Sequence, residues 1–97
     1  MKPDPLEKDI EAKVIEHAKK RGCLVYKFTS PARRSVPDRM FINPDGQVWF
    51  IEFKRLGCTP TPAQAVEIAK IRAMNVVVHV VDSVEQGKRV VELETML

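Results

Sequence analysis

The sequence has 97 residues, of which 44% are hydrophobic and 30% are charged. These values are typical of a globular chain, and the length suits one domain with a single core. No apolar stretch is long enough to span a membrane. Two cysteines, Cys23 and Cys58, are too few for a disulfide scaffold, so we expect a reducing, intracellular setting.

Basic residues are concentrated in one part of the chain. The whole chain carries a net charge of +3, but residues 19–39 alone carry +6, because this window holds seven basic residues and one acidic residue. The remainder therefore carries −3. This asymmetry favours a polyanionic partner such as nucleic acid, with a solvated basic surface as the alternative.

The first third of the chain predicts a helix, a strand and a loop. Residues 6–21 are expected to be helical, because apolar residues recur every fourth position at Leu6, Ile10, Val14 and Ala18. Gly22 is a natural helix stop. Residues 23–29 are rich in β-branched and aromatic types and predict a strand. A loop follows over 30–37, bracketed by two prolines.

The middle of the chain predicts a β-hairpin. Residues 38–43 and 47–54 form the two strands, joined by the turn sequence Asn43-Pro44-Asp45-Gly46. Gly46 is able to adopt the positive φ that such a turn requires.

The last third predicts a helix, a strand and a final helical segment. The helix runs from Thr61 to about Met74, with Thr61 and Gln64 placed to form a capping box. Residues 76–81 predict a buried strand. A last helical segment follows Ser83, although Gly87 weakens that prediction. The order α-β-β-β-α-β-α predicts an α/β fold with a mixed sheet flanked by helices.

The hairpin brings three charged residues together. If Asn43 faces Gln47 across the turn, Asp38 lies opposite Glu52, and Glu52 shares a face with Lys54. Two opposed carboxylates repel unless a cation lies between them, and hard oxygen ligands suit Mg²⁺ or Mn²⁺. Lys54 could stabilise charge on a phosphate or orient an attacking water. The alternative is a plain salt bridge at a frayed strand end.

These residues carry a resemblance to a known family. Val36-Pro37-Asp38, a short strand, a turn and Ile51-Glu52-Phe53-Lys54 resemble the PD-(D/E)XK nuclease signature. With Glu11 on the first helix and Gln64 on the second, the pattern resembles the VRR-NUC (virus-type replication-repair nuclease) branch over residues 6–82. The family often has glycine where this chain has Ser35.

The resemblance implies a restriction-endonuclease-like core and metal-dependent phosphodiester hydrolysis. By it, Asp38 and Glu52 ligate Mg²⁺ or Mn²⁺ together with the backbone carbonyl of Phe53, and Lys54 positions or activates the water. Glu11 completes the site from the first helix, directly or through a water, while Glu7, one turn earlier, competes for that role. Gln64 lies near the metal or the substrate, or only caps its helix.

Several basic residues are candidates for contacting the substrate. Arg33 and Arg34 precede Pro37-Asp38 in the loop, where substrate phosphates would lie, and arginine suits bidentate phosphate contacts. Lys27 and Arg55 could extend this track. Such contacts position a duplex without reading its sequence. Their alternative role is general solubility.

The most specific expectation is a structure-selective DNA endonuclease. We predict one nuclease domain over residues 1–97, with a loose tail at 1–5. Stand-alone members of the family resemble Holliday junction resolvases, so the resemblance implies a homodimer that cuts four-way junctions in DNA repair or recombination, in a phage or bacterial cell. The first alternative is a nucleic-acid-binding module without catalysis, and a weaker one is a protein-interaction domain.

Overall fold

A computed structural model describes residues 6–96, and the order of its elements is the predicted one. The helices and strands are α1 (Glu7–Lys20), β1 (Leu24–Lys27), β2 (Arg39–Ile42), β3 (Val48–Phe53), α2 (Pro62–Ala73), β4 (Val77–Val81) and α3 (Val84–Glu94). The predicted α/β class is therefore confirmed. The expected tail at 1–5 lies outside the described residues. Within residues 6–96, no helix has the length and apolar character that crossing a membrane requires.

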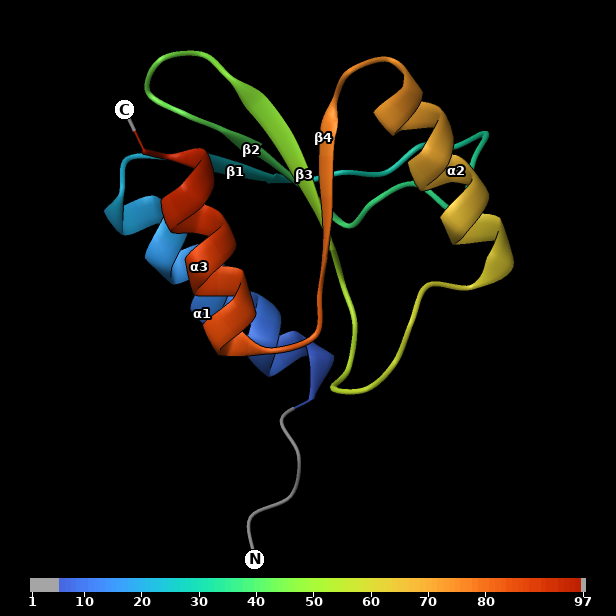
Figure 1. Ribbon diagram of the computed structural model, residues 1–97, viewed down its shortest axis with the longest axis horizontal. Helices are drawn as coiled ribbons and strands as arrows, with labels where there is room; N and C mark the ends of the chain where they lie inside the picture. The colour runs from blue at the N-terminus through green and yellow to red at the C-terminus, as the bar shows by residue number, and fades with distance from the viewer. Residues whose placement is uncertain (1–5, 97) are drawn as a thin grey trace, which may run out of the picture.

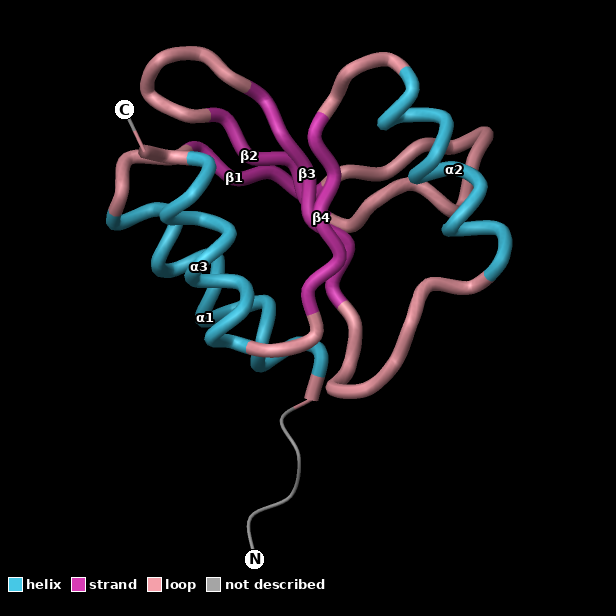
Figure 2. Tube along the Cα trace, in the orientation of Figure 1, coloured by secondary structure: helices cyan, strands magenta, loops and turns pink. Residues whose placement is uncertain are grey.

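The four strands form one mixed sheet in the order β1-β2-β3-β4. The first three strands run antiparallel to their neighbours, and β4 runs parallel to β3. Helices α1 and α3 pack side by side on one face of the sheet, and α2 covers part of the other (Figure 1). Figure 2 shows the same arrangement with the strands running between the two helical layers.

The hairpin has the predicted register. Arg39 pairs with Ile51 and Ile42 pairs with Val48. At the turn, the Asn43 N–H donates to the Gln47 carbonyl at 2.9 Å. Gly46 adopts a φ of +91°, the positive value expected of it.

The larger core lies between the sheet and the α1–α3 layer. Alternate residues of the hairpin point into it and are completely buried, namely Phe41, Trp49, Ile51 and Phe53. They meet the buried stripe of α1, in which Ile10, Val14 and Ala18 are buried as expected, whereas Leu6 is exposed.

Gly87 lies inside α3, where the sequence had weakened the helix prediction. A Cβ atom at this position would lie 2.3 Å from Cγ2 of Val14. Real Cβ atoms do not approach that closely, so glycine here is what lets α3 pack against α1. The tertiary contact offsets the low helix propensity of glycine.

The second face of the sheet has a smaller core, made by Phe50, Ile68 and Val78. Ile68 is the only residue of α2 that is buried. On this face, β3 brings Glu52 to the end of the sheet where β2 begins. The N-terminal ends of α1 and α2 approach the same end of the sheet (Figure 1).

Candidate nuclease active site

Asp38 connects the loop before β2 to the end of β3. Its backbone carbonyl accepts a hydrogen bond from the Phe28 N–H at 2.9 Å. Its side-chain Oδ2 accepts one from the Phe53 N–H at 2.8 Å. The carboxylate of Asp38 is thereby held beside the strand segment that carries Glu52, as the hairpin register predicted.

Glu52 is a buried carboxylate in a crowded electrostatic setting. Its side chain is 2% exposed, and Oε2 lies 3.2 Å from Nζ of Lys54. Oε1 is also buried and has no hydrogen-bond partner within residues 6–96. Burial first and the negative charge of Asp38 second raise the pKa of Glu52 from 4.5 to about 7, and the contact with Lys54 opposes both effects. The expected repulsion between Asp38 and Glu52 is thus present.

Lys54 is held between two acceptors. Its side chain is 14% exposed and its Nζ lies 3.2 Å from Glu52 Oε2. The same Nζ donates to Oε1 of Gln64 at 2.7 Å. The ammonium group is therefore fixed in position before any substrate arrives.

Gln64 caps its helix, one of the roles that the sequence left open, and also contacts Lys54. Its Oε1 accepts the Thr61 N–H at 2.9 Å, and its own N–H donates to Thr61 Oγ1 at 3.2 Å, which completes the capping box of α2. The Oε1 atom that caps the helix is also the atom that contacts Lys54. The capping box thus sets where Lys54 is held.

The two glutamates at the start of α1 have different surroundings. Glu11 accepts a hydrogen bond from Nη2 of Arg39 at 2.9 Å. Glu7 is influenced by the charges of Asp38 and Lys54, and its pKa is raised by partial burial first and by Asp38 second. The charges of Asp38 and Lys54 thus act on the exposed Glu7 carboxylate, while Glu11 forms an ion pair that the sequence analysis had missed. Arg39 is one of several basic residues in the window 19–39, and nothing in the sequence indicates that it pairs with Glu11.

The basic residues predicted to contact substrate divide into two groups. Lys27 and Arg34 are exposed and line, with Asp38, a hollow of about 290 Å³. Arg33 lines the same hollow, but its Nη1 also donates to Oε2 of Glu67 at 3.0 Å, so it fastens the loop to α2. Arg55 is exposed directly after Lys54.

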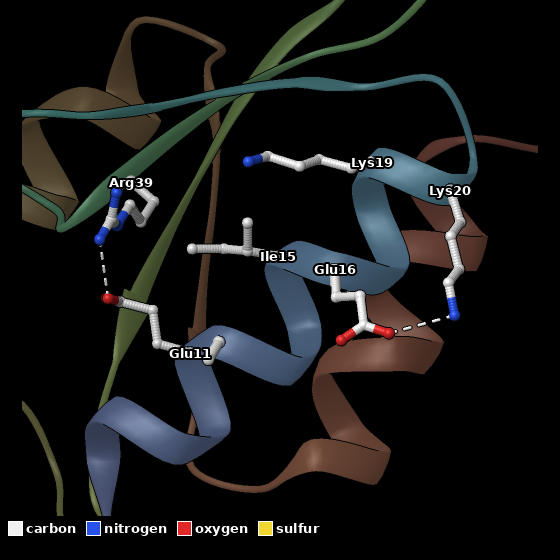
Figure 3. Close-up of a pocket in the computed structure, with 7 residues that line it drawn as sticks. Glu11, Ile15, Glu16, Lys19, Lys20 and Arg39 are labelled. Carbon is white, nitrogen blue, oxygen red and sulfur yellow. Dashed lines mark hydrogen bonds and ion pairs between the residues drawn. The ribbon is translucent and has the colours of Figure 1, made fainter.

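A larger hollow of about 640 Å³ lies along the outer side of α1. Figure 3 shows Ile15 in this hollow between Lys19 and Arg39, with the Glu11–Arg39 ion pair at one end. None of Asp38, Glu52 and Lys54 lines it. It is therefore separate from the carboxylate pair.

Known proteins share both the sequence and the fold of this chain. No protein-family model matches it. A protein named "Putative nuclease p44", from Acyrthosiphon pisum secondary endosymbiont phage 1, is 43% identical over 77 residues, which cover 79% of this chain and 83% of that protein. A solved structure described as a VRR_NUC domain matches with a TM-score of 0.83 and 29% identity, over 94% of this chain and 97% of that one. The chain belongs to the VRR-NUC nuclease family.

The donor atoms of this VRR-NUC domain can be compared with the needs of a divalent cation. Within residues 6–96, no three His, Cys, Asp or Glu side chains are close enough together to hold a metal ion alone. The protein offers two carboxylates, Asp38 and Glu52. The N–H and C=O groups of one strand residue point to the same side of the strand. Because the Phe53 N–H bonds to Asp38, the Phe53 carbonyl points to the side of Asp38 as well.

This set of oxygen donors fits Mg²⁺ or Mn²⁺. Mg²⁺ is commonly held by one or two carboxylates, with waters and substrate phosphates completing its shell. The buried Oε1 of Glu52, which lacks a partner in the described part of the chain, is an acceptor that a cation would satisfy. A cation would also remove the repulsion that raises the pKa of Glu52.

Proposed function

We propose that this VRR-NUC domain is a Mg²⁺- or Mn²⁺-dependent endonuclease that hydrolyses phosphodiester bonds in DNA. The observation that carries the proposal is the charge of Asp38 acting on the buried carboxylate of Glu52, whose Oε1 has no hydrogen-bond partner within residues 6–96. Asp38, Glu52 and the Phe53 carbonyl would hold the ion. When bound, the ion would polarise the phosphate and lower the pKa of a water molecule.

Lys54 would supply a positive charge from the protein itself, in addition to that of the metal ion. Its ammonium group donates toward charge that develops on the phosphate, or holds the attacking water in line. Both tasks need a fixed nitrogen atom. The contacts of Nζ with Glu52 and Gln64 support this role, because they leave Lys54 little freedom.

We assign the supporting carboxylate of α1 to Glu7, in place of Glu11. The charge of Glu7 acts on Asp38 and Lys54, whereas the Glu11 carboxylate is engaged by Arg39. Glu7 would accept a hydrogen bond from a water in the site. Glu11 would then help indirectly, by holding Arg39 at the start of β2.

Lys27, Arg34 and Arg55 would hold the backbone of the DNA. All three are exposed, and the first two border the hollow that contains Asp38. Phosphate contacts carry no sequence information, so discrimination would come from DNA shape. Gln64 would help catalysis indirectly, by holding Lys54 in place. Arg33 would help DNA binding indirectly, by fixing the loop against α2.

The most specific form of the proposal is a homodimer that cuts four-way junctions inside the cell. Residues 6–96 bring together one such pair of opposed carboxylates, Asp38 and Glu52. Matched cuts in two strands of a symmetric junction need two such sites. A second copy of the chain is the simplest source of the second site.

A cleavage panel tests the proposal. Wild type, Glu52→Gln and Glu94→Gln would each be incubated with a labelled four-way junction, a flap, a linear duplex and a single strand. Each reaction would contain Mg²⁺, Mn²⁺ or EDTA. Glu94 is a suitable control because it is also a shielded glutamate, with a side chain 12% exposed, but it pairs with His79 on the opposite side of the sheet from α2.

The expected result is metal-dependent cutting by wild type and Glu94→Gln, and no cutting by Glu52→Gln. Preference for the junction would support the resolvase form, while equal cutting of all substrates would leave a general nuclease. Binding without cutting in every metal would contradict the proposal and favour the nucleic-acid-binding module.

A further inference from the structure

The loop between β1 and β2 encloses the hollow of about 290 Å³ that borders Asp38. The two ends of the loop are tied together, because the Phe28 N–H donates to the Asp38 carbonyl at 2.9 Å. Its middle folds back on itself, where the Arg33 N–H donates to the Ser30 carbonyl at 3.3 Å. The Arg33 side chain also fastens the loop to α2 through Glu67. The wall of the hollow is therefore held in place at several points.

The lining of this hollow combines an aromatic ring with hydroxyl groups. Phe28 lies in the wall and is half-buried, with its ring tilted against that of Phe50 at a centroid distance of 5.0 Å. Thr29 and Ser30 follow it in the wall, and a hydroxyl group can donate or accept a hydrogen bond. Unstacked nucleobases bind proteins by stacking on aromatic side chains and by hydrogen bonds at their edges. The lining is therefore suited to a flat heteroaromatic ring.

The charges of the lining suit the phosphates on either side of such a base. Lys27 and Arg34 are exposed, and neither forms an ion pair within residues 6–96. Asp38 is the only acidic residue of the lining. A nucleotide whose base entered the hollow would thus have one phosphate near free cations and its strand passing the proposed metal-binding carboxylate.

The size of the hollow favours a single base over a larger ligand. Pockets for small molecules have volumes of about 300–1,000 Å³, and this hollow lies at the lower end of that range. A duplex cannot enter it, whereas one base turned out of a helix can. The larger hollow along α1 does not border Asp38, so it is not placed to hold a base of the strand that is cut.

We infer that this hollow receives one unstacked base of the DNA strand that passes Asp38. The inference rests on the proposed function and names the feature of DNA that the site selects. Turning a base out of a helix costs least where the base is already unpaired. Branch points and bulges offer such bases, and a fully paired duplex does not. The hollow would therefore select DNA structure at the position of the cut.

This selection would not depend on the identity of the base. Every nucleobase has an aromatic face, and stacking on an aromatic side chain tolerates all of them. The hydroxyl groups of Thr29 and Ser30 can each turn to donate or to accept. A domain that contacts phosphates and one unpaired base would thus discriminate between DNA structures without reading a sequence.

Binding to bulged duplexes tests the inference. Fluorescence anisotropy in EDTA would give the affinity of wild type for three duplexes, which are fully paired, have one extra thymine nucleotide, or have one extra abasic nucleotide. The two bulges share an interrupted helix, and only the thymine bulge has a base to place in the hollow. We expect about tenfold tighter binding of the thymine bulge than of the abasic bulge, which is about 1.4 kcal/mol. Equal affinities for the two bulges would overturn the inference.

Substitution of Phe28 tests which ring holds the base. Phe28→Leu keeps an apolar group against Phe50 but removes the aromatic face, so the preference for the thymine bulge should fall to about twofold or less. Tyr26→Leu is the matched control, because Tyr26 is an exposed aromatic residue on the same face of β1 that does not line the hollow. An undiminished preference in Phe28→Leu, or an equal loss in Tyr26→Leu, would contradict the assignment.

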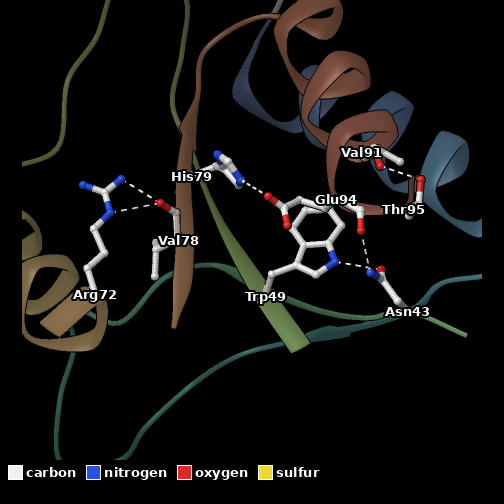
Figure 4. A network of polar contacts seen from close by, with 8 residues as sticks. All are labelled: Asn43, Trp49, Arg72, Val78, His79, Val91, Glu94 and Thr95. Atoms are coloured by element: carbon white, nitrogen blue, oxygen red, sulfur yellow. Dashed lines mark hydrogen bonds and ion pairs between the residues drawn. The ribbon is translucent and has the colours of Figure 1, made fainter. Parts of the chain in front are cut away.

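Tryptophan fluorescence would verify that both variants are folded. Trp49 is the only tryptophan of the chain, and it is completely buried in the larger core, where its Nε1 donates to Oδ1 of Asn43 at 2.8 Å (Figure 4). Its emission should not change in either variant. The comparison of the two bulges on wild type needs no variant at all.

Failure of this inference is distinguishable from failure of the proposed function. A protein that cuts in the cleavage panel but binds both bulges equally would keep the nuclease function and lose the base-binding hollow. A protein that prefers the thymine bulge but cuts no substrate would keep the hollow and lose the nuclease function.

Discussion

The Phe53 N–H donates to Oδ2 of Asp38 at 2.8 Å, and this bond joins the start of β2 to the end of β3. The Asp38 carboxylate therefore has a structural role as well as the proposed metal-binding one. The structural role needs an oxygen acceptor, whereas the metal-binding role needs a negative charge. Substitutions at Asp38 can separate the two.

Asp38→Asn should abolish cleavage but keep the fold, because an amide oxygen still accepts the Phe53 N–H. Asp38→Ala should abolish cleavage and also leave that N–H without its acceptor. The loss of a hydrogen bond to a charged group costs about 1.5–3 kcal/mol. Urea unfolding and a junction-cleavage assay on both variants would measure the two effects. Full activity of Asp38→Asn would rule out a role for the charge.

The stability of the metal-free protein should fall as the pH rises from about 4.5 to about 7. The pKa of Glu52 in the folded protein is about 7, above its ordinary value of 4.5, because of burial and the charge of Asp38. Between these values, the folded state keeps a proton that the unfolded state has released. Raising the pH through this window therefore favours unfolding.

Thermal melts in EDTA would measure this effect in wild type and Glu52→Gln. The stability advantage of Glu52→Gln should be small at pH 5 and should grow toward pH 8, since the variant cannot ionise. Mg²⁺ at pH 8 should raise the melting temperature of wild type more than that of Glu52→Gln, because a ligand stabilises the state that binds it. A constant difference between the two proteins at all pH values would contradict the prediction.

Gln64→Ala should impair catalysis more than Thr61→Ala does. Each substitution removes half of the capping box and should cost about 1 kcal/mol of stability. Only Gln64→Ala also removes the contact with Lys54 Nζ. We expect Gln64→Ala to lower kcat at least tenfold while Thr61→Ala stays near wild type. Equal kcat values for the two variants would mean that Gln64 only caps the helix.

Glu7→Gln should slow cleavage by at least tenfold, whereas Glu11→Gln should have a smaller effect. The charge of Glu7 acts on Asp38 and Lys54. Glu11→Gln breaks an ion pair with Arg39 that is partly exposed, and such pairs contribute about 1 kcal/mol or less. Single-turnover cleavage rates at saturating Mg²⁺ would compare them. The reverse order of rates would restore Glu11 to the role that the family resemblance implies.

Much of this molecule follows from local patterns in the sequence. The turn 43–46 determines the hairpin register. Side chains alternate between the two faces of a strand, so once the turn is set, the facing pairs and the face of each residue follow. That register alone places Asp38 near Glu52 and puts Lys54 on the same face as Glu52. The α1 stripe and the capping box of α2 are local as well, and each was predictable from spacing.

Other features depend on contacts between distant segments, which local patterns do not encode. That Glu11 pairs with Arg39 depends on how α1 is rotated against the sheet. The tolerance of Gly87 in a helix depends on the approach of Val14 from α1. The attachment of Arg33 to Glu67 depends on where α2 lies.

The sequence by itself determined the order of elements, the hairpin and the carboxylates that the hairpin opposes, because each depends on residues close together in the chain. Only the tertiary structure decided that Glu52 is buried with an oxygen that has no partner within residues 6–96, and that the side chains of Arg72 and Gln86 bond to the β4 carbonyls of Val78 and Val80. Burial and these side-chain bonds both arise where separate elements meet, and the geometry of that meeting is a property of the whole fold.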